Sequence, residues 1–426
     1  MARQDNISQS IDWPTVMIFI ACVIIGWFNI YAAVYNPELP NSIFDIETSA
    51  GRQLLLMGIA VIIITIIMVL DFRFYEAFAF PIYGLSMFSL VVVIFLGANV
   101  KGSHSFFKFG TFTLQPAEFS KMATILALAK YIGSSGVNLT RFKDQINVLI
   151  IVALPAILIK LSHETGVALV FSSMLLLLYR EGLPGVYPAI FLLLIALFVF
   201  ALVLPKIYMI VGLAALAGLV ILAMPRYERT RKNFILIGAL YVGMAATVFT
   251  VDFVFNNLLE AHQRSRITIL FNPESDRKGD GWNVIQSKIA IGSGGFWGKG
   301  FLEGTQTKFD FVPEQHTDFI FCTVGEEHGF IGSIVVIGLL IALIFRLMVL
   351  ADRQKNRFSR IYGYGVVSII FFHFLVNIGM TIGFIPVIGI PLPFFSYGGS
   401  SLWAFTMLLF IFLKLDAHKS QMLSRF

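Results

Sequence analysis

Long apolar runs, separated by short polar stretches, fill most of the chain from residue 13 onward. A helix needs about 20 consecutive apolar residues to cross the hydrocarbon core of a bilayer, and repeated runs approach that length. The pattern therefore predicts an all-α polytopic membrane protein with about twelve transmembrane helices in a single domain over residues 1–426. We place these helices near residues 13–34, 52–70, 75–97, 117–133, 146–162, 166–180, 186–204, 207–224, 234–254, 318–346, 361–384 and 401–414.

Composition points to the same class of protein. Hydrophobic residues make up 57% of the chain and charged residues 13%, and the mean hydropathy is +0.82. A soluble globular domain carries about 25% charged residues. Cys22 and Cys322 both lie inside apolar runs, so neither a disulfide framework nor a zinc motif is expected.

Lysines and arginines gather in alternate connections between the predicted helices, for example at residues 226–232 and 346–360. Positive charge in short loops marks the cytoplasmic side, so we expect both termini in the cytoplasm. The net charge of +6 then reflects membrane anchoring, and without a large basic domain no nucleic-acid partner is expected. This orientation places residues 255–317 outside the cytoplasm, together with the connections 98–116 and 385–400.

The long external loop contains the hydrophilic stretch "FNPESDRKGDGWN" at residues 271–283, with the acids Glu274, Asp276 and Asp280. Long structured loops often carry function, but hydrophilicity alone is equally typical of a solvated connection. The glycine run at 292–300 only loosely imitates a nucleotide-binding loop, because it lacks the strand–helix context. We therefore expect no nucleotide or organic cofactor. The glycines are expected to allow tight turns and close approach of the backbone.

Ionisable residues also occur where apolar runs begin. Glu118 and Lys121 follow Pro116, which can start a helix, and they share one face of that helix. Ionised groups are costly inside a bilayer and usually face a partner or a cavity. The pair either fixes helix packing or forms a polar wall that contacts an anionic group of a substrate. Glu164, in "KLSHETGV", fits a solvated hairpin as well as it fits a cavity lining.

Four more polar residues mark the start of a later span. His316 and Asp318 lie where the chain re-enters the membrane, and Glu326 and Glu327 follow about two turns deeper. We do not expect three carboxylates in one span all to face lipid. They are expected to form a proton or ion site, or to neutralise nearby arginine and lysine side chains.

The stretch "NIGMTIGFIPVIGIPLPFFSYGGSS", residues 377–401, contains three prolines that interrupt a helix and glycines that permit irregular backbone. Irregular backbone at membrane depth is tolerated only where it is buried in protein or lines an aqueous cavity. Ser396, Tyr397 and Ser400 would then present hydroxyl groups to that cavity.

Several of these segments resemble the SEDS family, and the likeness extends over about residues 10–415. They are "KFGTFTLQPAEFSKMA", "FNPESDRKGDGWNVIQSKIAIGSGGFWGKGF", "FVPEQHTDFIF" with "GEEHGFIG", and "NIGMTIGFIPVIGIPLPFFSYGGSS". The resemblance implies a peptidoglycan glycosyltransferase of cell elongation, in the bacterial cytoplasmic (inner) membrane, that polymerises lipid II on the outer face. It also implies a class B penicillin-binding transpeptidase as partner, besides membrane lipids.

The resemblance makes Asp276 the essential acid of the external loop. The supporting positions that match the family are Glu118, Lys121, His316, Asp318, Glu326, Glu327 and Ser396 through Ser401, including Tyr397 and Ser400. Ser105 replaces a family arginine that would contact phosphate, and Glu164 stands at an acidic position within a changed motif. The family is expected to have ten spans, so we place an extra helix pair among the apolar runs between residues 186 and 254.

Glycosyl transfer requires a sugar hydroxyl to attack an anomeric carbon whose leaving group is a lipid-linked diphosphate. Asp276 is the first choice for the general base, a contribution of roughly 10²–10⁴-fold, or it holds a Mg²⁺ or Mn²⁺ ion. Arg264, Arg266, Lys121 and Lys288 are candidates to stabilise the diphosphate. We expect inversion by one displacement. The alternatives are a lipid II flippase that uses the intramembrane charges and a non-enzymatic scaffold for the transpeptidase.

Overall fold

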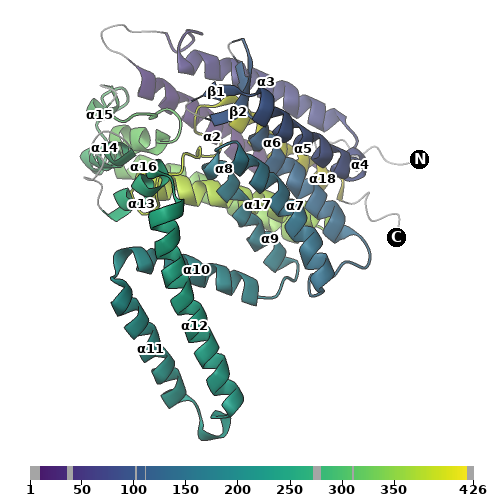
Figure 1. The fold of residues 1–426 in the computed structure, drawn as a ribbon. Coiled ribbons are helices and arrows are strands. Elements are labelled where there is room, and N and C mark those ends of the chain that lie inside the picture. Colours follow the sequence, from purple (N-terminus) through teal and green to yellow (C-terminus); the bar gives the residue numbers. More distant parts are fainter. Residues whose placement is uncertain are drawn as a thin grey trace. The chain divides into compact units, whose positions relative to one another are not determined.

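The computed structural model describes residues 10–35, 42–100, 103–110, 112–271, 280–308 and 311–419. Figure 1 shows that helices make up nearly all of the fold. The helices are α2 (Trp13–Val34), α3 (Ser49–Val69), α4 (Phe72–Ala77), α5 (Ala79–Leu96), α6 (Pro116–Gly133), α7 (Phe142–Leu161), α8 (Thr165–Val170), α9 (Met174–Arg180), α10 (Val186–Val203), α11 (Lys206–Ala223), α12 (Arg231–Phe253), α13 (Ala261–Phe271), α14 (Asp280–Ser293), α15 (Thr305–Lys308), α16 (Ile320–Asp352), α17 (Arg357–Thr381) and α18 (Gly399–Ala417).

Among the described residues, ten helices are long and apolar enough to cross a membrane. The predicted class, a polytopic helical membrane protein, is therefore confirmed. Two further predicted spans are helical but do not meet that measure. The pair α8–α9 is short and is interrupted by a 3-10 turn at Phe171–Ser173. α6 carries Glu118 and Lys121 and is largely buried in protein, so it needs less apolar surface than a lipid-facing helix. The count of twelve is not confirmed.

A small antiparallel sheet departs from the all-α expectation. It consists of β1 (Ala98–Val100), β2 (Ser103–Phe109) and β3 (Phe112–Leu114), in the order β1–β2–β3. The sequence "SHSFFKFGTFTL" is rich in phenylalanine and threonine, which favour strands. The chain reverses at Gly110, whose φ of +62° suits glycine. The connection before α6 is therefore an ordered hairpin.

The chain divides into two compact units, residues 1–183 with 277–426 and residues 184–276. In the first unit, α17 packs against α6 and α16, and α18 packs against α3 (Figure 1). Glycine allows the closest approaches. A Cβ on Gly26 of α2 would lie 2.7 Å from the Cα of Phe395, in the chain between α17 and α18. Irregular backbone therefore packs directly against a helix.

Arginine–carboxylate pairs join helix ends in the first unit. Arg346 of α16 donates hydrogen bonds of 3.1 and 2.5 Å to Asp12, the residue before α2. Arg353, after α16, binds the carboxylate of Asp416 near the end of α18 with two donors. Such two-pronged pairs fix geometry as well as charge. The beginning of α2 and the end of α18 therefore lie on the same side of this unit.

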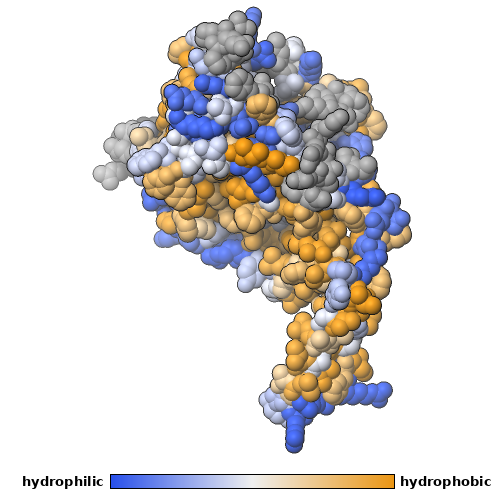
Figure 2. Space-filling model, turned by 90° about the vertical axis from the view of Figure 1, so that its left-hand side faces the viewer, coloured by the Kyte–Doolittle hydropathy of each residue, from blue (hydrophilic) through white to orange (hydrophobic). Residues whose placement is uncertain are grey.

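The second unit contains α10, α11, α12 and α13. Its small core is formed by Leu197, Met209 and Val248, and Lys206 pairs with Asp252 at 2.5 Å. Most other side chains of α10–α12 are exposed although they are apolar. Figure 2 shows that the visible face of these helices is mostly hydrophobic and is hydrophilic at the α11–α12 turn. A helix that is apolar on all sides suits a lipid environment.

The glycine run 294–300 packs on a break in α16. At that break Gly329 has non-helical dihedrals, φ 63° and ψ −153°. The amide of Gly300 donates to the carbonyl of Glu327 at 3.0 Å, and a Cβ on Gly298 would lie 2.1 Å from the same oxygen. The expectation that these glycines serve close backbone approach is confirmed.

We predict that Gly298→Ala destabilises the protein by about 1–3 kcal/mol, because alanine is strained at the φ of +85° and its Cβ has no room. Gly292→Ala is the matched control, since this position lies in α14 and has no atom within 4 Å of a new Cβ. Equilibrium unfolding in mixed micelles measures both variants. Equal stability of the two variants would contradict the packing described for the glycine run.

Candidate functional site

Residues 382–398, here called the α17–α18 segment, have no regular secondary structure, and the stretch 392–396 within them is buried. Their three prolines have no backbone N–H to donate. Ile390 and Phe395 are both 0% exposed. Irregular backbone in such surroundings requires hydrogen-bond partners from other parts of the protein.

Two other candidate segments meet this segment and the start of α18. The amide of Tyr397 donates to the carbonyl of His316 at 2.9 Å, and their ring centroids are 5.5 Å apart. The hydroxyl of Ser400 accepts a hydrogen bond from the amide of Gln115 at 2.9 Å and donates to the carbonyl of Thr113 at 3.2 Å. The hairpin before α6 and the chain before α16 are thereby brought to one place.

Asp318 and Ser396 help to shape the α17–α18 segment. A Cβ on Gly389, whose φ is +75°, would lie 3.4 Å from Oδ2 of Asp318. The side-chain amide of Asn377 donates to the backbone carbonyl of Asp318 at 2.8 Å. Ser396 Oγ accepts a hydrogen bond from the amide of Leu392 at 2.8 Å. The Ser396 hydroxyl thus closes a turn within the segment.

Glu118 and Lys121 form a buried ion pair in α6. Lys121 Nζ lies 2.9 Å from Glu118 Oε2, and the two side chains are 0% and 2% exposed. The same nitrogen lies 3.0 Å from Nε2 of His373 on α17 and 5.0 Å from the ring centroid of Phe405 on α18. Because Lys121 is enclosed and its ammonium group is engaged, it faces no substrate in this structure. The geometry favours the packing role over the polar wall.

His373 and Asn377 have roles that were not predicted from the sequence. Both side chains bind carbonyls of the α17–α18 segment and are 0% exposed. Their spacing could have revealed them, because two polar residues four positions apart in an otherwise apolar run share one helix face. Such groups rarely face lipid, so a buried partner was to be expected.

Glu326 and Glu327 are adjacent but have different surroundings. Glu326 Oε1 accepts hydrogen bonds from Lys299 Nζ at 2.6 Å and from the amides of Thr305 and Gln306 at 2.8 Å each. It therefore neutralises a lysine and caps the start of α15. Glu327 is 1% exposed, and its carboxylate oxygens have no hydrogen-bond partner within the described part of the chain.

Lys288 lies on α14, beside the beginning of the α17–α18 segment. The neighbouring Ser287 donates to the carbonyl of Thr381 at 2.9 Å, which holds α14 against the end of α17. A Cβ on Gly383 would lie 2.5 Å from Nζ of Lys288. The Lys288 side chain is exposed, so its ammonium group is accessible to an anion.

The remaining candidates are distributed over three places. Glu164 accepts a hydrogen bond of 2.7 Å from the hydroxyl of Ser105, which links β2 to the start of α8. Arg266 lies on α13, in the second unit. Asp276 and Glu274 lie outside the described residues, so the assignment of the catalytic acid stays a prediction.

No group of three or more His, Cys, Asp or Glu side chains is placed to hold a metal ion among the residues that the structure describes. A Mg²⁺ ion usually keeps several waters and is bound through one or two carboxylates plus substrate phosphates. The expectation of a divalent cation therefore depends on Asp276 together with a bound diphosphate. It does not depend on a cage of protein ligands.

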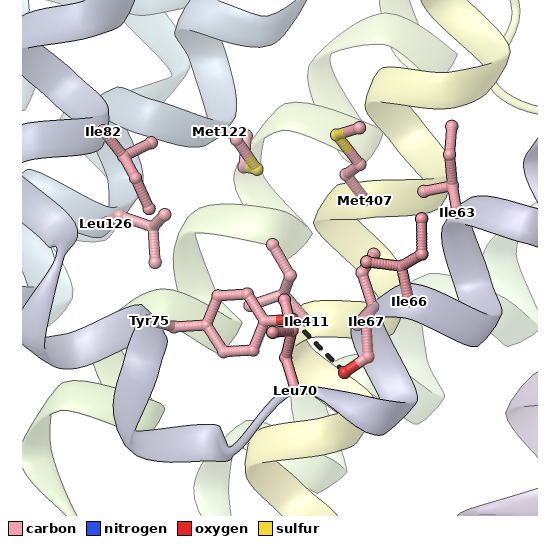
Figure 3. Close-up of a pocket in the computed structure, with 10 residues that line it drawn as sticks. All are labelled: Ile63, Ile66, Ile67, Leu70, Tyr75, Ile82, Met122, Leu126, Met407 and Ile411. Atoms are coloured by element: carbon pink, nitrogen blue, oxygen red, sulfur yellow. Dashed lines mark hydrogen bonds between the residues drawn. The ribbon is translucent and has the colours of Figure 1, made fainter.

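A pocket of about 280 Å³ opens among α3, α4, α5, α6 and α18 (Figure 3). Its lining is Ile63, Ile66, Ile67, Leu70, Tyr75, Ile82, Met122, Leu126, Met407 and Ile411. The hydroxyl of Tyr75 is directed to the carbonyl of Ile67 at 3.3 Å. This lining offers contacts for a hydrocarbon chain and no charged group for a diphosphate, so the pocket is not the polar site.

Comparison with known proteins identifies relatives along nearly the whole chain. The family model of FtsW/RodA/SpoVE proteins, described as cell cycle protein, matches residues 12–216 and 213–421. Peptidoglycan glycosyltransferase MrdB of Escherichia coli K12 is 32% identical over 428 residues, covering 99% of each chain. Peptidoglycan glycosyltransferase RodA of Treponema pallidum is 28% identical over 433 residues, covering 96% of this chain and 98% of RodA.

Solved structures show the same fold. A chain from a peptidoglycan synthase complex that coordinates polymerisation and crosslinking superposes with a TM-score of 0.70 at 26% identity, covering 96% of this chain and 99% of that chain. RodA of Thermus thermophilus superposes with a TM-score of 0.61 at 23% identity, covering 96% of this chain and 97% of that chain.

We predict that Lys121→Met lowers the free energy of unfolding by about 3–5 kcal/mol, because it leaves the buried carboxylate of Glu118 without its cation. The double variant Glu118→Gln/Lys121→Met should lose less than Lys121→Met alone. Lys130→Met is the control, since Lys130 lies on the same helix as Lys121. Its pair with Glu76 of α4 is 37% and 42% exposed and should contribute at most about 1 kcal/mol. Additive effects of the two α6 substitutions in equilibrium unfolding would contradict the pairing.

Proposed function

Because the chain belongs to the FtsW/RodA/SpoVE family of cell cycle proteins, we propose that it polymerises lipid II into glycan strands on the outer face of the bacterial cytoplasmic membrane during cell elongation. It is a peptidoglycan glycosyltransferase, the activity by which its relatives MrdB and RodA are named. It is also a multi-pass membrane protein, with ten membrane-length helices among its described residues.

The meeting of three motif-bearing segments at one end of the helices of the first unit carries this proposal. Tyr397 contacts His316, and Ser400 binds the backbone at Gln115, so groups far apart in the sequence form one polar surface. Lys288 adds an exposed positive charge beside it. A lipid-linked diphosphate sugar needs such a place, with polar groups for the head and lipid nearby for the tail.

The charge pattern supports an external position for this surface. Ser400 lies at the start of α18 and Asp416 near its end, and a helix of 19 residues is about 28 Å long. The arginines that bind Asp12 and Asp416 are on the far side, and clustered positive charge marks the cytoplasmic side. Both termini are then cytoplasmic and the reaction takes place outside.

The reaction forms a bond between a sugar hydroxyl of one substrate and the anomeric carbon of the other. The bond from that carbon to the lipid-linked diphosphate breaks, and the diphosphate leaves with the electron pair. Asp276 accepts the hydroxyl proton as general base. A single displacement of this kind inverts the anomeric configuration.

The negative charge that develops on the diphosphate needs cationic side chains nearby. The two candidate lysines of the first unit differ in how easily a substrate could reach them. Lys288 is exposed beside the α17–α18 segment, whereas Lys121 is enclosed between Glu118 and His373. We therefore assign diphosphate contact to Lys288 and a supporting role to Lys121. The role of Arg266, which lies on α13 in the second unit, stays a prediction from the sequence. In the alternative role of Asp276, its carboxylate and the diphosphate would together hold a divalent cation, which would neutralise this charge.

A class B penicillin-binding transpeptidase is the partner that fits this function, because newly polymerised strands must be crosslinked. The similar chain with a TM-score of 0.70 comes from a complex that coordinates polymerisation and crosslinking. Membrane lipids surround the apolar helices and accommodate the polyprenyl tail of the substrate.

We predict that Asp276→Ala lowers lipid II polymerisation by at least about 100-fold, because the hydroxyl proton loses its acceptor. The assay combines the protein purified with its transpeptidase partner and labelled lipid II, and measures glycan chains by gel electrophoresis. Glu274→Gln and Asp280→Asn are controls in the same loop and should stay close to wild type. Polymerisation by Asp276→Ala at the wild-type rate would remove Asp276 from the mechanism.

Two further experiments test the rival functions and the divalent cation. Lipid II movement across vesicles by a wild-type protein that makes no glycan would favour a flippase, and glycan made only in the presence of a polymerising partner would favour a scaffold. Treatment with a chelator tests the metal. Activity that disappears with the chelator and returns with Mg²⁺ or Mn²⁺ supports a role for a divalent cation, whereas unchanged activity counts against the cation and leaves Asp276 the role of base.

A further inference from the structure

The α17–α18 segment obtains hydrogen-bond donors from one face of α17. Asn377 donates its side-chain amide to the carbonyl of Ile390 at 2.8 Å. His373 Nδ1 lies 3.1 Å from the carbonyl of Pro391. The two side chains are four residues apart, so they lie one above the other on the helix. Prolines in the segment cannot form an internal ladder, and these side chains satisfy carbonyls that would otherwise be unpaired.

The buried ion pair fixes which nitrogen of His373 carries the proton. Nε2 lies 3.0 Å from Nζ of Lys121, and a lysine ammonium group only donates. Nε2 must therefore accept, and the proton of the neutral ring lies on Nδ1, directed at the carbonyl of Pro391. Glu118 holds Lys121 in place at 2.9 Å. The pair in α6 thus sets the hydrogen bond that α17 makes to the segment.

The contacts continue from Pro391 to the polar surface. The next residue, Leu392, donates its amide to the hydroxyl of Ser396 at 2.8 Å. Tyr397 follows and donates its own amide to the carbonyl of His316 at 2.9 Å. A displacement at Pro391 would therefore move the turn that presents these groups.

We propose that His373 is a positioning residue of the glycosyltransferase site: it holds the α17–α18 segment through the carbonyl of Pro391, and the Glu118–Lys121 pair orients its ring. The effect on catalysis rests on the proposed function. The effect on the segment does not, and it can be measured separately.

The two hydrogen bonds of His373 can be removed one at a time. In His373→Asn the side-chain amide can replace Nδ1 and keep the bond to Pro391, whereas in His373→Gln the side-chain oxygen can replace Nε2 and keep only the bond to Lys121. Hydrogen exchange of peptides covering residues 385–398 in nanodiscs is the direct readout. We expect His373→Gln to raise exchange at Leu392, Phe395 and Ser396 by at least about fivefold, and His373→Asn to stay within about twofold of wild type.

Ser368→Ala is the matched control. This buried serine on α17 donates only to the carbonyl of Tyr364 in its own helix, at 2.8 Å, so its loss should not change exchange in the segment. Selective loosening by His373→Gln, with His373→Asn and Ser368→Ala unchanged, supports the proposal. Any other pattern overturns it, including equal loosening by both His373 variants or loosening spread over the whole chain.

Polymerisation of lipid II by the same variants tests the catalytic consequence. We expect kcat to fall by about tenfold in His373→Gln, with little change in KM, and to be largely retained in His373→Asn, because a misplaced site lowers the rate more than binding. A wild-type rate in His373→Gln, despite a loosened segment, overturns the positioning role. If the wild-type protein makes no glycan, the proposed function fails, while the exchange result still decides whether His373 holds the segment.

Discussion

An irregular, proline-containing backbone inside a membrane protein must find hydrogen-bond partners outside itself, and the first unit is arranged to supply them. His373 and Asn377 on α17 bind consecutive carbonyls of the α17–α18 segment. An unpaired polar group in such surroundings costs several kcal/mol. This cost is a large part of the total free energy of unfolding of a typical domain, which is about 5–15 kcal/mol. The buried ion pair of Glu118 and Lys121 contributes to this hydrogen bonding, because Lys121 contacts the ring of His373, which makes one of these bonds.

The same constraint explains the positions of several glycines. The segment can be enclosed only if helices approach its backbone closely, and a Cβ would prevent that. On Gly26 of α2 it would lie 2.7 Å from the Cα of Phe395, and on Gly166 of α8 it would lie 2.4 Å from the carbonyl oxygen of Ile388. A segment held closely by its neighbours can then position Tyr397 and neighbouring groups with the precision that glycosyl transfer demands.

Hydropathy predicted the helices well because long apolar runs leave few alternatives; the run 13–34 is α2 (Trp13–Val34). It could not predict the partners of buried polar groups, which depend on packing between distant segments. Adjacent Glu326 and Glu327 have opposite surroundings, and Lys121 binds a histidine 252 residues away. The family resemblance suggested which segments form the site, and that assignment stays a prediction, as does the role of Asp276, which lies outside the described residues.

The central claim is that the α17–α18 segment and the adjoining part of α14 receive the head of the substrate. Photocrosslinking tests this most directly, with lipid II that carries a photoreactive group on the sugar next to the diphosphate, followed by mass spectrometry of labelled peptides. We expect labels within residues 382–401 and near Lys288, and none at the arginine-rich helix ends around Arg346 and Arg353. Labels at those ends, or spread evenly along the helices as for a transported lipid, would contradict the account.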